Sequence, residues 1–544
     1  MGTLLVAATA SGASTSGEKH SKERFTAGIL TNHVIAADRD GLAIHPVTNE
    51  RFTNGFAYSN YVEKILRNAE DFFGDPARKT SDPVTVRLLV HVHGGLNDEK
   101  DTFERVVRNV PLMTNEAPAD LFYPIFFRWP SSLGDTYAEH LLRIRQGRKN
   151  QSHFLDTITV PYILVSDVAQ AFGKMPITWY YQSVNFKDRY SSGHAWTRGW
   201  LQSPQWGAAD NKAALRTNPP PTLRFEPEQV VHIARGEFYF SGWERYLKIP
   251  LWFVQTPVRM TAGTIGQTSI AEQSWKNMRR RTEQILAPAT LYGENVDTDL
   301  VNACAAGNFF HILNERIKQR NTNEIRYELT FIGHSMGAIV LNNLLTRYHS
   351  EYVEINSLKN IVYMGAACSV NNAVNAIRPL LNEYNPDDPE EDDKRPLLRF
   401  YNLTLNRVAE IAETEALGFA PAGSLLEYID QHLQSPESAL DRTMGSEVNI
   451  LSAIEVFDKR QNFVTYKSFD RNWGRIPMKH GDFSLCPFWK QAFWSSETTT
   501  LTNKQIVLNN YGKDWYSRDV AYRRLEPTTK FQIQNQTKPP TGKE

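Results

Sequence analysis

A serine flanked by glycines stands between a strand-like and a helix-like segment of the chain. The run from Leu329 to Ile332 is apolar and rich in β-branched and aromatic residues, as in a buried strand. It leads into Gly333-His334-Ser335-Met336-Gly337, after which apolar residues recur at helical spacing as far as Leu345. A G-x-S-x-G turn in this context predicts a nucleophile elbow, with the Ser335 hydroxyl as nucleophile.

A serine hydroxyl needs a base within hydrogen-bond reach, and a histidine is the usual one. His480 is the candidate because it follows the last predicted strand, just before an aromatic segment that begins at Phe488. This position also gives the chain order serine, acid, histidine that triads on open α/β sheets have. The alternative for His480 is a loop residue at the start of the next helix, with Asp482 as the helix cap.

The third member of a triad is a carboxylate that orients the histidine. It should follow the strand that ends near Leu405, and Glu410 is the first carboxylate after that strand. Asn406, which directly follows this strand, carries no carboxylate. The acid therefore stays open between Glu410 and four competitors, Glu413, Glu415, Asp430 and Asp441.

An oxyanion hole requires two N–H donors beside the nucleophile. We expect one from Met336, the residue after the serine, and the other from the turn Gly94-Gly95-Leu96, with Gly95 or Leu96 as the donor. That turn follows a β-branched strand, Val84 to His93. His93 is expected to orient the turn, and His91 to point to the opposite face of the strand in a structural role.

Strand-like and helix-like segments alternate along much of the chain. Helical patterns begin at Lys100, Gln273 and Val301, and further strands are expected at 121–129, 360–367, 397–405 and 462–469. This order predicts an α/β fold with a mostly parallel central sheet wrapped by helices. The active site of such a sheet lies beyond the carboxyl ends of its strands.

The chain divides into five predicted regions. Residues 1–27 form a polar, disordered lead, 28–132 and 273–522 form the two parts of the α/β domain, and 523–544 form a disordered tail. Residues 133–272 are an aromatic-rich insertion, either a cap over the pocket or a peripheral surface. Its most apolar part, Phe238 to Val258, is expected to lie over or beside the pocket, the alternative being packing on outer helices. The run Arg279-Arg280-Arg281 is expected to be a solvated or salt-bridged face.

Composition excludes several classes of protein. Lys plus Arg equals Asp plus Glu, at 60 each, so nothing indicates nucleic-acid binding. Three scattered cysteines favour neither a disulfide framework nor a metal site, and no cofactor is expected.

The sequence contains no run of 18 apolar residues, so no transmembrane helix is predicted. Peripheral contact with a membrane stays open. Cytoplasmic localisation is expected, with export by a truncated signal around Leu4 to Ala10 as the alternative. The oligomeric state is open.

The motifs VHVHGGLND, FRWPSS and FIGHSMGA together resemble the α/β-hydrolase superfamily. Within it they are similar to uncharacterised serine hydrolases with a VHGxN turn, a WPS strand end and a GHSMG elbow, over residues 84–132 and 301–493. The resemblance implies a serine hydrolase that cleaves small-molecule or lipid carboxylic esters through an acyl-enzyme, and lipase-like and phospholipase-like activities are among those it implies. The alternative is a catalytically silent binding or scaffold protein that uses the insertion as a partner surface.

Overall fold

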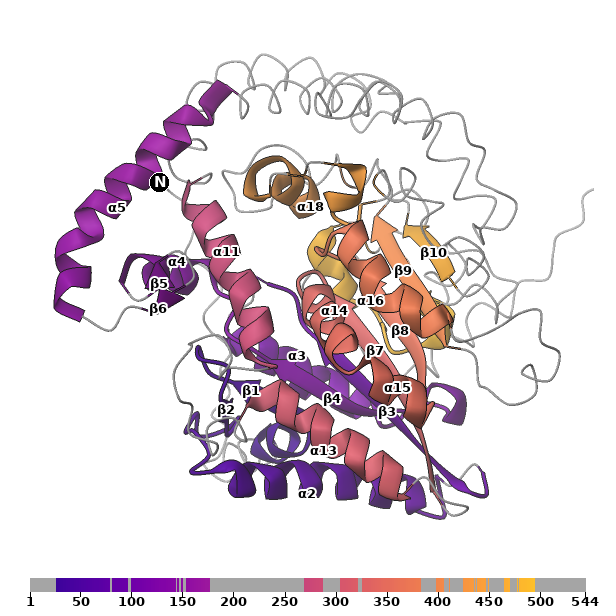
Figure 1. Cartoon of the computed structure of the whole chain (residues 1–544). Coiled ribbons are helices and arrows are strands. Elements are labelled where there is room, and N and C mark those ends of the chain that lie inside the picture. The colour runs from indigo at the N-terminus through magenta and orange to yellow at the C-terminus, as the bar shows by residue number, and fades with distance from the viewer. Residues whose placement is uncertain are drawn as a thin grey trace, which may run out of the picture.

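The computed structural model describes residues 26–176, 269–286 and 304–494, with internal gaps of which the longest are 383–397, 411–423 and 450–463. Eight strands form one sheet in the order β10-β9-β8-β7-β3-β4-β1-β2 (Figure 1). The strands are β1 (Val34–Ala37), β2 (Ala43–Ile44), β3 (Val84–Val92), β4 (Tyr123–Arg128), β7 (Ile325–His334), β8 (Leu358–Met364), β9 (Arg399–Leu405) and β10 (Val464–Phe469).

Every neighbouring pair in this sheet is parallel except β1 and β2, which pair antiparallel. The predicted mostly parallel sheet is therefore confirmed. From β3 the chain passes outward to β4, then returns to the other side of β3 as β7 and continues outward to β10. Such a reversal of strand order opens a crevice at the carboxyl ends of the two central strands. Val92 lies beside Gly333 in the register, so β3 and β7 end next to each other there.

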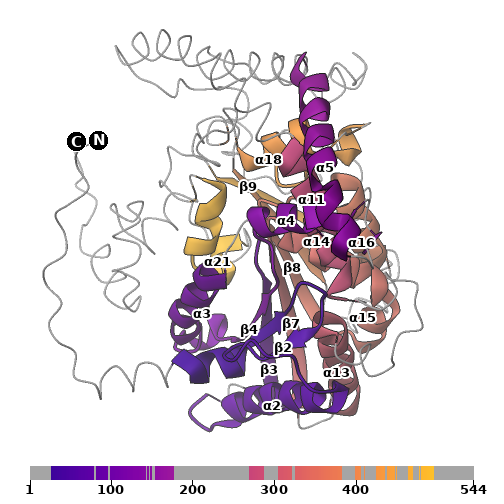
Figure 2. The same cartoon turned by 90° about the vertical axis from the view of Figure 1, so that its left-hand side faces the viewer.

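Helices cover both faces of the sheet. Figure 2 shows α3 (Glu99–Met113) and α21 (Gln491–Trp494) on one side, with α14 (Gly337–Arg347), α15 (His349–Ile355) and α16 (Val370–Asn382) on the other. On that second side α13 (Ala305–Arg320) also packs against α2 (Gly55–Gly74). Each face of the sheet carries its own hydrophobic cluster, because alternate residues of a strand point to opposite faces. Val90 belongs to the cluster with α14, and Leu89 to the cluster with α3.

Further helices gather at the carboxyl end of the sheet (Figures 1 and 2). They are α4 (Leu133–Leu142), α5 (His153–Gly173), α11 (Ser269–Gln284), α18 (Leu425–Tyr428) and a single π-helical turn, η4 (Ile429–Leu433). A buried ion pair fastens α4 to α11, since Arg281 Nη2 lies 2.7 Å from Glu139 Oε2 and both side chains are 1% exposed. Of the predicted arginine face, Arg280 also pairs with Glu139, at 3.2 Å.

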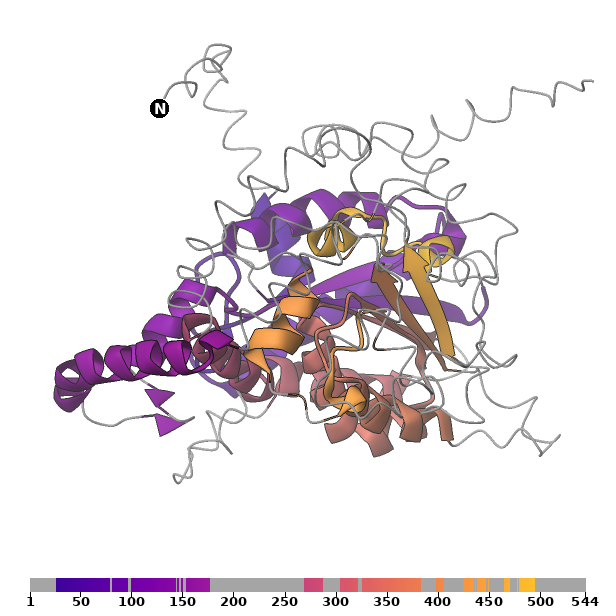
Figure 3. The same ribbon diagram turned by 90° about the horizontal axis from the view of Figure 1, so that it is seen from above.

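The helix α5 extends away from the body, as Figures 1 and 3 show. Ile158, Tyr162 and Val165 are exposed on it. Both α4 and α5 belong to the predicted insertion, 133–272, in which the sequence shows no regular alternation of strand and helix patterns. Helical periodicity does not reveal α5, because apolar residues lie on most of its sides and because it contains Pro161, a residue that is unfavourable inside a helix. A small hairpin, β5 (Ile144–Arg145) with β6 (Arg148–Lys149), separates the two helices.

Several predicted features lie outside the described residues. They are the first 25 residues of the predicted lead, the tail 523–544 and the aromatic segment Phe238 to Val258. Within the part of the chain that the structure describes, none of the helices has both the length and the apolar character needed to cross a bilayer.

Candidate active site

Ser335 directly follows β7 and, with Met336, connects it to α14; its backbone has the left-handed conformation, with φ of 53°. A side chain with a Cβ adopts this conformation at a cost of about 1–3 kcal/mol, so the surrounding structure must hold it there. Three backbone hydrogen bonds do so. The Ser335 N–H donates to Met364 O at 3.0 Å, and Ser335 O accepts from the N–H groups of Ala338 at 3.2 Å and Ala367 at 3.0 Å.

The two glycines of the motif allow the strand and the helix to approach closely. A Cβ on Gly333 would lie 2.9 Å from Ala338 Cα, and one on Gly337 would overlap the carbonyl oxygen of Val92. Any larger residue at either position would therefore push the helix away from the sheet. The glycine spacing in the sequence follows from this geometry.

The turn after β3 lies directly against the elbow. A Cβ on Gly94 would come within 2.7 Å of Ser335 Cβ, and one on Gly95 within 2.5 Å of Met336 Sδ. The turn predicted to supply an oxyanion donor thus faces the serine across the strand ends. Met336 is buried and precedes the first residue of α14. Leu96 lies outside the described residues.

His93 fixes this turn in place. Its Nε2 accepts a hydrogen bond from the Trp129 N–H at 3.3 Å, so its Nδ1 carries the proton that it donates to Gly94 O at 2.6 Å. The ring also stacks on Trp129, with centroids 5.7 Å apart. Burial lowers the pKa of His93 to about 3, which keeps the ring neutral. His93 therefore has the orienting role expected of it, while His91 points to the other face and stacks on Phe488 at 4.6 Å.

His480 packs at the same end of the sheet as Ser335, at the start of the 3₁₀ helix η7 (His480–Leu485). Its ring lies over Gly365, where a Cβ would be 2.9 Å from His480 Nδ1. Gly365 directly follows Met364, whose carbonyl binds the Ser335 N–H. Within the described residues no hydrogen bond joins the Ser335 hydroxyl to the His480 ring.

The neighbour of the serine, His334, links the elbow to His480. Its Nε2 donates to the carbonyl oxygen of His480 at 3.0 Å, and the two rings lie 5.2 Å apart. Burial lowers the pKa of His334 to about 4, and burial followed by the proximity of His334 holds the pKa of His480 well below its usual value. Both imidazoles are thus neutral, which is the form in which a histidine accepts a proton. Sequence reasoning gave His334 no role, although its place inside the motif was a signal.

Glu410 is fully buried and accepts a hydrogen bond from Ser446 Oγ at 3.1 Å. The residue before that serine, Gly445, donates its N–H to Ala366 O at 2.8 Å. Glu410 is therefore tied to the loop that contacts the segment after β8, and the ring of His480 packs on the same segment.

The competing acids have other partners or lie outside the described residues. Asp430 accepts from the N–H and the hydroxyl of Thr443, at 2.9 and 3.0 Å, and from Asn449 Nδ2 at 2.8 Å. Burial raises its pKa in spite of these bonds. Asp430 thus holds the 443–449 loop, and Asp441 accepts from the N–H and hydroxyl of Ser438. Glu413 and Glu415 are among the residues that are not described.

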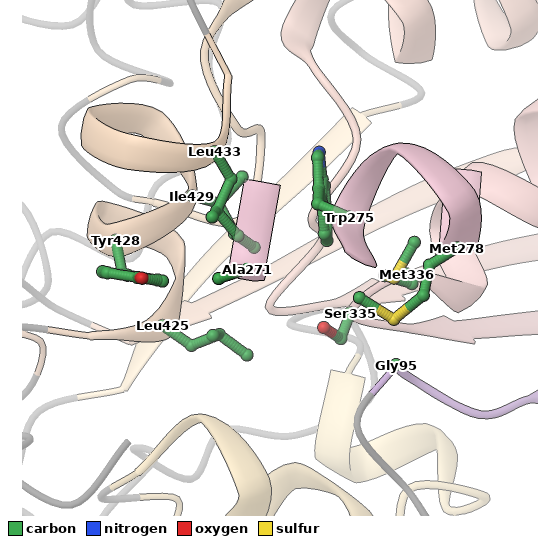
Figure 4. A pocket seen from close by; sticks show the side chains of 10 residues that line it. All are labelled: Gly95, Ala271, Trp275, Met278, Ser335, Met336, Leu425, Tyr428, Ile429 and Leu433. Atoms are coloured by element: carbon green, nitrogen blue, oxygen red, sulfur yellow. The ribbon is translucent and has the colours of Figure 1, made fainter. Parts of the chain in front are cut away.

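A narrow apolar pocket opens at Ser335 (Figure 4). Its free volume of about 10 Å³ is close to that of one water molecule. Ser335, which is 2% exposed, contributes a hydroxyl to walls that are otherwise almost entirely apolar. The walls come from the two turns and from the helices at the carboxyl end, namely Gly95, Met336, Ala271, Trp275, Met278, Leu425, Tyr428, Ile429 and Leu433.

The residues from α18 and η4 were not expected in the pocket. They lie far beyond the elbow in the sequence, between segments without a clear pattern, and only the fold brings them to Ser335. Among the described residues, no group of three or more histidine, cysteine or acidic side chains is arranged to hold a metal ion. Comparisons with protein-family models, curated proteins and solved structures found no match to this chain.

Proposed function

We propose that this protein is a serine hydrolase of the α/β-hydrolase fold that cleaves carboxylic esters through an acyl-enzyme intermediate. The observation that carries the proposal is Ser335, held at a φ of 53° between strand and helix with the Gly94-Gly95 turn against it. Strain of this kind persists where function requires it, and a nucleophile on a sharp turn is such a case.

In the proposed mechanism Ser335 Oγ attacks the acyl carbon of the ester while its proton passes to the imidazole of His480. The resulting oxyanion accepts hydrogen bonds from the N–H of Met336 and from the Gly95 or Leu96 N–H of the facing turn. The tetrahedral intermediate then breaks its C–O bond, and the alcohol leaves with the proton from His480. Water then attacks the acyl-enzyme and gives its proton to His480, which passes it to Ser335 Oγ as the acid is released and Ser335 is regenerated. Glu410 has the role of orienting the imidazole.

The walls of the pocket support an apolar acyl group. Most of the side chains that line it are hydrocarbon or thioether, and an acyl chain that moves from water into such surroundings gains about 0.8 kcal/mol for each buried CH₂ group. A lipase-like or phospholipase-like preference belongs to this proposal. The competing proposal is a silent scaffold, and the observation in its favour is that the described pocket has room for about one water molecule.

Labelling with a fluorophosphonate probe separates the two proposals, because only an activated serine attacks phosphorus. The wild-type protein should be labelled, whereas Ser335→Ala should not. Ser59→Ala, a control on the distant helix α2, should be labelled like the wild type. His480→Gln should slow labelling by a factor of about 10³ or more. Labelling of Ser335→Ala, or no labelling of the wild type, would favour the scaffold.

A further inference from the structure

A second, polar cavity adjoins the apolar pocket and shares two of its walls, Trp275 and Leu433. Its volume of about 420 Å³ lies within the range of small-molecule sites. Charged side chains of α11 line one side, and the start of α16 lines another. Unlike the pocket at Ser335, this cavity suits a polar group.

The acidic groups around the cavity are already satisfied. Glu272 accepts a hydrogen bond from Lys174 and forms an ion pair with Lys276 at 2.9 Å. Asp441 accepts from Ser438, as described above. The guanidinium of Arg279 also lines the cavity, and it has no ion-pair partner in the part of the chain that the structure describes. The side of the cavity at Arg279 is therefore positive.

The first turn of α16 adds to this potential. Ser369 Oγ accepts from the Asn372 N–H at 3.1 Å, which makes Ser369 the cap of the helix. Both residues line the cavity. Because the N-terminus of a 13-residue helix carries partial positive charge, it attracts an anion to the same space as Arg279.

Trp275 provides a further donor between the two cavities. Its indole Nε1 is buried and has no acceptor among the described residues. In Figure 4 this nitrogen lies at the end of the ring that is turned away from Ser335. A buried N–H without an acceptor is costly, and a ligand oxygen would remove the cost.

We propose that this cavity binds an oxyanion, a carboxylate or a phosphate, on the alcohol part of the ester whose acyl chain occupies the pocket at Ser335. The inference rests on the proposed ester hydrolysis and names its substrate class. Arg279 supplies the charge-assisted hydrogen bonds, and the start of α16 and Trp275 supply further positive potential and a donor. An ester whose alcohol part carries a phosphate and one whose alcohol part carries a carboxylate would both supply such an oxyanion.

Three butyrate esters of similar length test the proposal, namely 3-hydroxypropyl butyrate, its phosphate monoester and 4-(butyryloxy)butanoate. The ratio of kcat/KM for an anionic ester to kcat/KM for the neutral one should be about 10 in the wild type and near 1 in Arg279→Gln. A ten-fold change corresponds to the loss of one charge-assisted hydrogen bond. Arg279→Glu should reverse the preference. Arg67→Gln on α2 is the matched control and should keep the wild-type ratio. The anionic ester with the higher ratio identifies the source, and equal ratios in the wild type and Arg279→Gln would overturn the inference.

Binding without catalysis separates this inference from the proposed function. Ser335→Ala is titrated calorimetrically with octyl phosphate, and the double variant Ser335→Ala/Arg279→Gln should bind it about five-fold to ten-fold more weakly. Equal affinity in the two variants would overturn the inference even if the wild type hydrolyses esters. Arg279-dependent binding of octyl phosphate, together with a wild type that hydrolyses none of the esters, would support the oxyanion site and contradict the proposed ester hydrolysis.

Discussion

At the scale of single residues, three glycines show that the same residue type has different consequences at different positions in the fold. A Cβ at Gly337 would meet backbone, the carbonyl of Val92, which cannot move without shifting β3. A Cβ at Gly95 would meet the end of the Met336 side chain, which is flexible. At Gly74 a Cβ would meet nothing within 4 Å. The space around each glycine thus indicates what a larger residue would disturb: the packing of helix on sheet at Gly337, the turn beside Ser335 at Gly95, and nothing at Gly74.

We expect Gly337→Ala to lower the free energy of unfolding by about 3 kcal/mol, because overpacking against backbone is not relieved by a side-chain rotation. Gly95→Val should change it little and reduce kcat/KM for ester hydrolysis by about 10², since the facing N–H groups move. Gly74→Ala is the control for both. Denaturant unfolding and steady-state kinetics measure the two effects. Full activity in Gly95→Val would remove the turn from the mechanism.

The neutral state of His480 predicts the pH dependence of activity. A base is active when it is unprotonated, and burial together with His334 lowers the pKa of His480 well below its usual value. The acid limb of kcat/KM should therefore lie below pH 6.5, and activity should stay level from pH 8 down to about 6.5. Circular dichroism at each pH shows that the protein is still folded. An acid limb centred at or above pH 6.5 would show that His480 is not the base.

At the scale of elements, the pocket depends on how α11 is fastened. The ion pair Glu139–Arg281 connects it to α4, and Arg281 Nη1 also donates to Pro130 O at 2.8 Å, at the end of the strand segment before α4. Burial lowers the pKa of Arg281, although the Glu139 carboxylate opposes this shift. Since α11 carries Trp275 and Met278 into the pocket, this pair positions part of the site wall.

Arg281→Met should lower the free energy of unfolding by about 3 kcal/mol, because it leaves the Glu139 carboxylate buried with only Arg280 beside it. The double variant Glu139→Leu/Arg281→Met should recover much of this loss, since neither charge is then buried. Arg78→Met breaks an exposed pair with Asp75 and should cost less than about 1 kcal/mol. Urea unfolding of the four proteins makes the comparison. A double variant less stable than Arg281→Met would contradict the expectation.

The sequence predicted the elements whose apolar residues recur with a clear strand or helix spacing, and it missed elements without such spacing. The β-branched strands β3 and β7 and the helix α14 are where their patterns put them, and so is the turn at Gly94 that faces Ser335. The helices α18 and η4 were missed because a four-residue helix and a single π-turn have no measurable period. The role of Asp430 could not be predicted from the sequence either, because only three-dimensional contacts show that it holds the loop at Thr443.

At the scale of the whole molecule, five buried histidines, His33, His91, His93, His334 and His480, share one property. Burial lowers the pKa of each, to about 4 for His33 and His334, to about 3 for His93, and well below the usual value for His91 and His480. Between the unfolded value of 6.5 and these lower values, the unfolded chain binds more protons than the folded one. Stability contributed by the neutral rings is therefore complete above pH 6.5 and is lost as the pH falls.

We expect the melting temperature to be level above pH 7 and to fall between pH 6.5 and 4, with each histidine contributing at most about 1.4 kcal/mol per pH unit. His91→Phe removes one such group and keeps the stacking on Phe488, so its curve should fall less steeply. Calorimetric scans across this pH range measure both slopes. Parallel curves for the two proteins would show that His91 does not titrate in this way.

The small free volume at Ser335 should also affect the rate at which a substrate or probe reaches the serine. Under the proposed function, a substrate enters this pocket, which has room for about one water molecule, only after α11 or the 425–433 segment moves, and we expect a first-order opening step before chemistry. The rate of labelling by a fluorophosphonate should then reach a plateau as probe concentration rises. Probes of different intrinsic reactivity should reach the same maximum labelling rate. The variant Trp275→Ala should raise this maximum rate by enlarging the entrance to the pocket. A rate that stays proportional to concentration would mean that the open state is already the dominant one.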